Sequence, residues 1–246
     1  MHGNGGTAPL KVKTNLRELA YRSFTQSLVA SRIRPGQFMS QRELVAMTGI
    51  PLSAIRELIP RLEAERLIET VPQRGLRVAG VDLRMVKEVF QLWAVLAKAG
   101  AEAFIEIAPD DLIEELALAH RAILLRAGEM PDEELADNSR RLEQRLHDLL
   151  IGALGNEIIA DLYRVNQIKI EMIRLARGGW TRHSILSSLE ERVEILDALK
   201  LRDALRLAKA VAAHIEAMLH RAMKPMPASF SKERSGGTSK SGKVAA

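Results

Sequence analysis

The pattern that most constrains this chain lies between residues 82 and 223, where apolar residues recur at helical spacing almost without interruption. Proline or glycine breaks the pattern at Pro109, Pro131, Gly155 and Gly179, at intervals of 22 to 24 residues. Helices joined by loops this short pack antiparallel to their neighbours, so the pattern predicts a bundle of six or seven helices. We expect these helices at residues 82–107, 110–128, 132–153, 156–177, 182–200 and 203–223.

The segment in front of this bundle, residues 12–80, has a different pattern of short elements. Ser40 with Glu43 forms a capping box, which predicts the start of a short helix, and Pro51 is suited to open the next helix. We expect helices at residues 14–31, 40–47 and 52–65, and strands at 67–71 and 76–78. This order is typical of a winged helix-turn-helix. The chain is therefore expected to be mainly α, with a winged helix-turn-helix followed by an all-helical domain over residues 81–224.

Charge divides the chain at the same place. The net charge is only +5, but residues 10–80 hold 12 Lys and Arg against 6 Asp and Glu, whereas residues 81–224 hold 20 against 24. A basic module on an acidic body is what a nucleic-acid-binding domain joined to another domain would show. The two ends, residues 1–11 and 225–246, are rich in Gly, Ser or Lys, and we expect both to be disordered tails.

Composition excludes several classes of protein. Without cysteine there is no disulfide scaffold, thiol nucleophile or thiolate metal site, so a metal would need histidine and carboxylate ligands. No P-loop, Rossmann glycine run or nucleophile elbow is present, and we do not expect an enzyme. The first residues lack the apolar core of a signal peptide, and no apolar stretch approaches the length of a spanning helix. We expect a soluble, cytoplasmic protein with no membrane partner.

Residues 14–223 resemble the GntR family of bacterial transcription regulators, in the FadR-like subfamily with a C-terminal FCD domain. The resemblance in the first domain rests on Ile33-Arg34-Pro35-Gly36, Gln41-Arg42-Glu43-Leu44, Gly49-Ile50, Ile55-Arg56-Glu57, the run from Arg61 to Ile68, and Arg74-Gly75-Leu76-Arg77-Val78. In the second domain it rests on His147, Gly155-Asn156, Asp197-Ala198 to Asp203, and His214.

The resemblance implies a homodimer that binds double-stranded DNA at an inverted-repeat operator. The residues that would contact DNA are Arg42, Ser53, Ala54, Arg56, Arg74 and Gly75. Arginine can grip a guanine edge or a phosphate, Ala54 could touch a thymine methyl, and glycine allows close backbone approach. The chain departs from the family where the recognition helix opens, because Leu52 stands in place of an arginine, and Pro60 falls inside that helix.

The resemblance also implies an effector site in the FCD domain. Many FCD domains hold a divalent metal with an Asp-x-x-x-His pair and two later histidines; here those positions are Glu143, His147, Arg192 and His214. Because arginine cannot bind a metal, three interpretations stay open. Arg192 binds an anionic effector such as a carboxylate directly; or Glu143, His147 and His214 alone hold zinc, nickel or manganese; or Arg192 is structural.

Trp93 stands where the family often has an arginine, and it is either a wall of the effector pocket or ordinary core packing. The leading hypothesis is a repressor that a small organic acid releases from DNA. The alternatives are a regulator whose C-terminal domain only dimerises, and a helical metalloenzyme using Glu143, His147 and His214.

Overall fold

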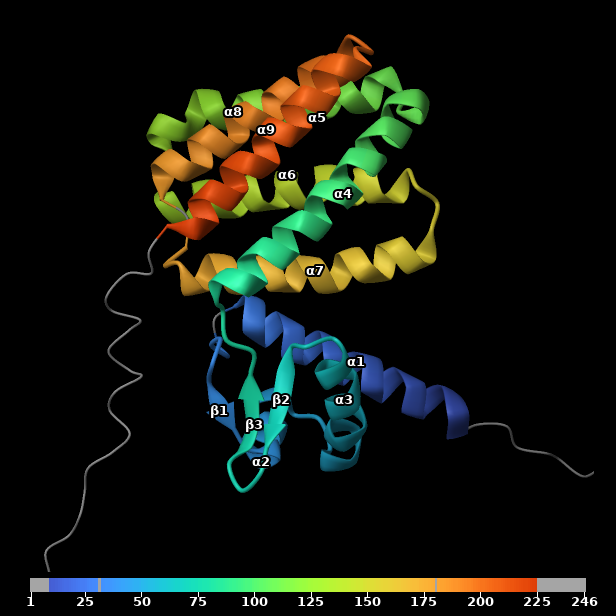
Figure 1. The fold of residues 1–246 in the computed structure, drawn as a ribbon, viewed down its shortest axis with the longest axis vertical. Coiled ribbons are helices and arrows are strands. Elements are labelled where there is room, and N and C mark those ends of the chain that lie inside the picture. Colours follow the sequence, from blue (N-terminus) through green and yellow to red (C-terminus); the bar gives the residue numbers. More distant parts are fainter. Residues whose placement is uncertain (1–8, 31, 180, 225–246) are drawn as a thin grey trace, which may run out of the picture.

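The computed structural model describes residues 9–30, 32–179 and 181–224. Within these residues, Figure 1 shows two domains stacked along the long axis, a small one built around a short sheet and a larger one of long helices. The predicted tails at residues 1–8 and 225–246 lie outside the described residues. The first helix begins at Pro9, five residues before its predicted start at residue 14.

The first domain has the predicted order of elements. Its helices are α1 (Pro9–Val29), α2 (Gln41–Thr48) and α3 (Leu52–Ala64), and its strands are β1 (Phe38–Met39), β2 (Ile68–Val71) and β3 (Gly75–Val78). The strands form an antiparallel sheet in the order β1-β3-β2. Strand β1 was not predicted, because two residues are too few to show an alternating pattern. It pairs Phe38 with Arg77 and Met39 with Leu76.

Local signals fix the turn between α2 and α3. The Glu43 amide donates to Ser40 Oγ at 3.1 Å, and the Ser40 amide donates to Glu43 Oε2 at 2.6 Å, which confirms the capping box. Gly49 ends α2 with φ of 69°, a left-handed conformation that glycine adopts without strain. Helix α3 runs through Pro60 without a break.

The second domain is a bundle of six α-helices in the described residues, with ends within two residues of those predicted. They are α4 (Leu83–Ile107), α5 (Asp110–Arg126), α6 (Asp132–Gly152), α7 (Glu157–Ala176), α8 (Arg182–Lys200) and α9 (Ala204–Met223), with a 3₁₀ turn at Ala127–Glu129. Side chains of Asp82, Asn156, Thr181 and Asp203 cap four of them. None of the described helices is long and apolar enough to cross a membrane.

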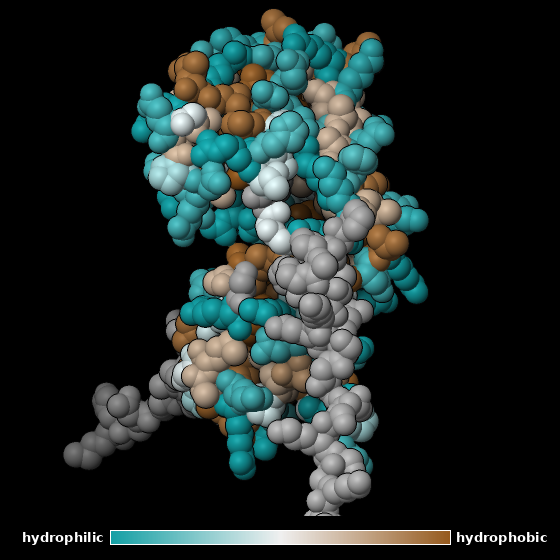
Figure 2. Space-filling model, turned by 90° about the vertical axis from the view of Figure 1, so that its left-hand side faces the viewer, coloured by the Kyte–Doolittle hydropathy of each residue, from teal (hydrophilic) through white to brown (hydrophobic). Residues whose placement is uncertain are grey.

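Helix α4 follows the wing directly and packs against α6, α7 and α9 in the larger domain. At Gly100 it comes so close to α6 that a Cβ atom would lie 2.5 Å from the Leu150 carbonyl oxygen. Where the two domains meet, α7 lies next to α1 (Figure 1). Figure 2 shows hydrophilic residues over much of one face of both domains, with hydrophobic residues gathered near the far end of the bundle.

Candidate DNA-reading surface and buried polar centre

Three of the predicted DNA contacts lie exposed on α2 and α3: Arg42, Ser53 and Arg56. Arg56 Nε lies 3.4 Å from Gln41 Oε1, which places this arginine beside the first turn of α2, where Arg42 also lies. Ala54 does not share this surface. Its exposed fraction is 6% and it belongs to the hydrophobic core, so the structure does not support its predicted contact with a thymine methyl.

The wing presents Arg74 at its exposed tip. The Arg74 guanidinium lies over the Phe38 ring, 4.3 Å from its centre, and this cation–π contact with β1 orients a side chain that would otherwise be free in solvent. Gly75 has φ of 89°, and a Cβ atom there would lie 2.8 Å from the Met39 carbonyl oxygen. Glycine at this position is therefore required by the packing of β3 on β1, whether or not it also approaches DNA.

The other arginine of α3, Arg61, faces inward to α1 instead of outward. It forms ion pairs at 3.0 Å with Glu18 of α1 and with Glu65, and its guanidinium lies 3.6 Å from the centre of the Tyr21 ring. Tyr21 completes the cluster by donating to Glu65 Oε2 at 2.7 Å. We call Glu18, Tyr21, Arg61 and Glu65 the α1–α3 clasp, because they join the recognition helix to the helix that faces the larger domain.

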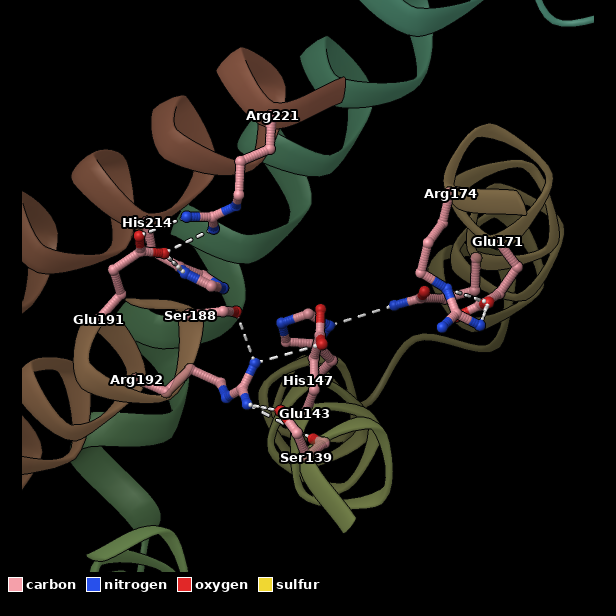
Figure 3. A network of polar contacts seen from close by, with 11 residues as sticks. Ser139, Glu143, His147, Glu171, Arg174, Ser188, Glu191, Arg192, His214 and Arg221 are labelled. Atoms are coloured by element: carbon pink, nitrogen blue, oxygen red, sulfur yellow. Dashed lines mark hydrogen bonds and ion pairs between the residues drawn. The ribbon is translucent and has the colours of Figure 1, made fainter. Parts of the chain in front are cut away.

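Inside the bundle, α6, α8 and α9 bring together a polar centre that we define as Ser139, Glu143, His147, Ser188, Arg192 and His214 (Figure 3). Arg192 has no exposed surface. It donates to Ser188 Oγ at 2.9 Å and Ser139 Oγ at 2.8 Å, and its Nη1 lies 3.2 Å from Glu143 Oε2. Burial lowers the pKa of Arg192, an effect that the charge of Glu143 opposes. Arg192 of α8 is thus paired with Glu143 of α6.

His214 faces a carboxylate that the sequence analysis did not identify. Its Nδ1 lies 2.7 Å from Glu191 Oε2, and Arg221 donates to both oxygens of Glu191 at 2.6 and 2.8 Å (Figure 3). Burial raises the pKa of Glu191, but the bonds from Arg221 and His214 outweigh it and bring the value down to about 2. Glu191 directly precedes Arg192, and Arg221 lies seven residues after His214, yet only the packing of α8 on α9 shows that they meet.

Two further rings adjoin this centre. Trp93 of α4 is buried with its ring centre 4.4 Å from that of His147, so the residue predicted as a pocket wall does lie against the predicted site. His120 of α5, which the sequence analysis did not single out, is fully buried and its Nδ1 lies 2.7 Å from the Leu116 carbonyl oxygen. Burial lowers the pKa of His120 to about 4, and burial, with nearby His214 and Arg192, holds the pKa of His147 well below its ordinary value. Both imidazoles are neutral at pH 7.

Four buried nitrogen atoms around the centre have no hydrogen-bond partner among the residues that the structure describes: Trp93 Nε1, His120 Nε2, Arg192 Nε and His214 Nε2. Because His120 Nδ1 must carry its proton to bond a carbonyl, His120 Nε2 is an unpaired acceptor, whereas Trp93 Nε1 and Arg192 Nε are donors. Unpaired buried polar atoms are costly and rare, and several in one place indicate room for water or a ligand.

The same arrangement tests the predicted metal site. Among the described residues, no group of three or more His, Asp and Glu is placed to hold a metal ion. The Glu143 carboxylate is paired with Arg192, and a buried guanidinium lies where the family places a ligand. The residues Glu143, His147 and His214 therefore do not fit a metal.

A cleft of about 1150 Å³ is lined by residues of α1, α6 and α7. Glu143 and His147 line it from the bundle, and Tyr21 of the α1–α3 clasp lines it from the first domain. The polar centre is thus reached from a space whose walls belong to both domains.

Comparison with known proteins agrees with this architecture in both halves. Residues 16–78 match the family of bacterial regulatory proteins named for gntR, and residues 88–217 match the FCD domain. The chain belongs to the GntR family. It is a transcriptional regulator with a DNA-binding helix-turn-helix and an FCD domain, and not an enzyme, so the metalloenzyme alternative is not supported.

Relatives of this GntR regulator carry names of the same kind. The Nta operon transcriptional regulator of Aminobacter aminovorans is 26% identical over 76% of this chain and 85% of its own length. The HTH-type transcriptional repressor GlaR of Escherichia coli K12 is 23% identical over 79% of this chain and 90% of its own. Among solved structures, E. coli McbR/YncC shares the fold with a TM-score of 0.68 and 15% identity, covering 85% of this chain and 99% of its own.

Proposed function

We propose that this GntR regulator is a repressor that binds an inverted-repeat operator as a homodimer. The single observation that carries the proposal is the exposed set on α2, α3 and the wing, namely Arg42, Ser53, Arg56 and Arg74. One such module offers few base contacts, so selecting one site needs two modules related by a two-fold axis. The repressor GlaR is a relative, which favours the same sign of regulation here.

Dimerisation through the bundle is supported by its exposed hydrophobic side chains. Leu118 and Leu125 lie seven residues apart on α5 and are 57% and 87% exposed, and Leu205 at the start of α9 is 68% exposed. Residues seven apart lie on one face of a helix. Exposed apolar side chains of this size are typical of surfaces that a second subunit covers.

We also propose that a small organic acid is the effector and that it binds at the polar centre. Arg192 places a buried positive charge there, and Trp93 Nε1 and Arg192 Nε are donors for which the described residues provide no acceptor. A carboxylate would accept from such donors and balance the charge. A hydroxyl or amine on the same acid would donate to His120 Nε2, which has no donor.

Selection from random-sequence DNA tests the DNA-binding part of the proposal. The wild-type chain should enrich a sequence with two-fold symmetry. Arg56→Ala should lose about tenfold or more in affinity for that sequence, since a bidentate base contact is worth ~1–3 kcal/mol. Arg84→Ala, which removes an exposed arginine of α4, is the matched control and should bind as the wild type does. Enrichment of no sequence, or equal binding by both variants, would contradict the proposal.

Thermal stability with added ligands tests the effector part. A panel of small organic acids, with and without EDTA, should contain members that raise the melting temperature independently of EDTA. Stabilisation by divalent metals alone would instead support the three-ligand metal site. Stabilisation by neither would support a C-terminal domain that only dimerises.

A further inference from the structure

A second, smaller cavity lies in the bundle apart from the polar centre. It has a volume of about 70 Å³ and is formed where α4, α7, α8 and α9 meet. Its apolar wall comes from Phe90, Ile170, Ile173, Met218 and Ala222. Three arginines, Arg174, Arg177 and Arg221, also line it, together with Gly179 and Ser184. None of the described residues that line it belongs to the polar centre.

The three arginines differ in their partners. Arg174 Nε donates to Glu171 Oε2 at 2.8 Å, and Arg221 pairs with both oxygens of Glu191. Arg177 donates from Nη1 to the main-chain oxygen of Lys224 at 2.8 Å, and it forms no ion pair with any described residue. Its Nε is buried without an acceptor in the described part of the chain. The cavity therefore holds a positive charge that no described carboxylate balances.

Two further features favour an anion in this cavity. Ser184, another lining residue, lies in the first turn of α8, where the helix dipole favours negative charge, although its own amide already donates to Thr181 Oγ1 at 3.2 Å. The apolar wall lowers the local dielectric constant beside the charge and so strengthens its attraction for an anion. An apolar wall opposite an unbalanced guanidinium fits a ligand with a charged head and a hydrocarbon tail.

We propose that this cavity binds a short unbranched monocarboxylate, with its carboxylate on Arg177 and its alkyl chain against Phe90, Ile173 and Met218. The small volume limits the ligand to a few carbon atoms. This site does not depend on the proposed effector site, because it uses other residues. The two are connected, since Arg221 at the cavity pairs with Glu191, which in turn contacts His214 of the polar centre.

Calorimetric titration of the full chain with acetate, butyrate, hexanoate and octanoate tests the site, with inorganic phosphate as a tailless anion. Affinity should rise with chain length to a maximum and then fall, and phosphate should bind more weakly than the best acid. Arg177→Gln should weaken the best acid by about tenfold or more, as expected for loss of a charged hydrogen-bond donor. Ala222→Leu, which fills the cavity without changing charge, should weaken it as well.

Two controls separate this site from others. Arg126→Gln removes an exposed arginine of α5 and should leave binding unchanged. The double variant Arg192→Met with Glu143→Leu, which alters only the polar centre, should also retain binding. The proposal is overturned if no acid binds, if phosphate binds as tightly as every acid, if folded Arg177→Gln and Ala222→Leu bind normally, or if the double variant abolishes binding. None of these results depends on DNA binding or on the effector at the polar centre.

Discussion

The DNA-reading surface and the polar centre both depend on arginine, but they use it in opposite ways. Arg56 is exposed, with one long contact to Gln41, so its charge remains available to a partner. Arg192 is fully buried, and hydroxyl and carboxylate groups of α6 and α8 receive most of its donors. The environment of each arginine therefore decides its role. The exposed guanidinium of Arg56 is accessible to DNA, whereas the buried guanidinium of Arg192 bonds α6 to α8 and could bind an anion.

The largest effect should come from breaking the buried pair. Arg192→Ala leaves Glu143 and two serine hydroxyls without their donor, and removing one partner of a buried ion pair costs about 3–5 kcal/mol. Replacing both partners, as Arg192→Met with Glu143→Leu, should restore most of that loss because no charge stays unpaired. Urea denaturation followed by circular dichroism measures both. If Arg192→Ala were as stable as the wild type, the bonds of Arg192 between α6 and α8 would not contribute to the free energy of unfolding.

The next effect concerns helix contact within the bundle. Gly100→Ala places a methyl group 2.5 Å from the Leu150 carbonyl oxygen, and forcing α4 away from α6 should cost about 1–3 kcal/mol. Gly152→Ala, at the end of α6 with nothing within 4 Å, is the matched control and should be neutral or slightly stabilising. Equal stabilities of the two variants in the same denaturation experiment would contradict the close approach of α4 and α6.

A decrease in pH should destabilise the helical bundle more than the winged domain. His120 and His147 have pKa values below those of the unfolded chain, so below pH ~6.5 the unfolded state binds more protons and stability falls as pH decreases. Each histidine contributes up to ~1.4 kcal/mol per pH unit, from pH ~6.5 down to its folded pKa, which is about 4 for His120. Glu191 adds a loss at lower pH, between its ordinary pKa and about 2.

Among the described residues of the first domain there is no histidine. Hydrogen exchange at pH 7 and pH 5 should therefore show weaker protection at the lower pH in α5 and α6, after correction for intrinsic rates, with little change in α2 and α3. His120→Leu should reduce the change in the bundle. A larger loss of protection in the winged domain would contradict the assignment of these titrations.

The smallest effect is expected at the wing. Arg74 stacks on the exposed Phe38 ring, a contact worth about 0.5–1 kcal/mol at such a site. Phe38→Ala should weaken DNA binding less than Arg56→Ala does, by only a few-fold, because Arg74 keeps its charge but loses its orientation. Competition binding on the selected DNA would measure the ratio. A loss greater than that of Arg56→Ala would mean that the wing dominates recognition.

The sequence predicts those features of the fold that depend on residues close together in the chain. The capping box at Ser40, the left-handed Gly49 and the proline and glycine breaks between helices act within a few residues, and each lies where it was expected. Strand β1 and the burial of Ala54 were missed because both depend on packing against distant segments. Arg192 and Glu143 were identified as site residues because they occupy positions that are metal ligands in the family. Their partners Ser139 and Ser188, and Glu191 beside His214, become evident only when α6, α8 and α9 pack.

An organic acid bound at the polar centre is expected to change the affinity of the winged domain for DNA. Fluorescence anisotropy of the selected DNA, titrated with the regulator with and without the acid that raises its melting temperature, tests this directly. The acid should raise the apparent Kd by about 5- to 150-fold, the usual range for coupled sites. The folded double variant Arg192→Met with Glu143→Leu should bind the DNA, and its apparent Kd should not change when the acid is added. An unchanged Kd in the wild type, or an equal shift in the double variant, would contradict the claim.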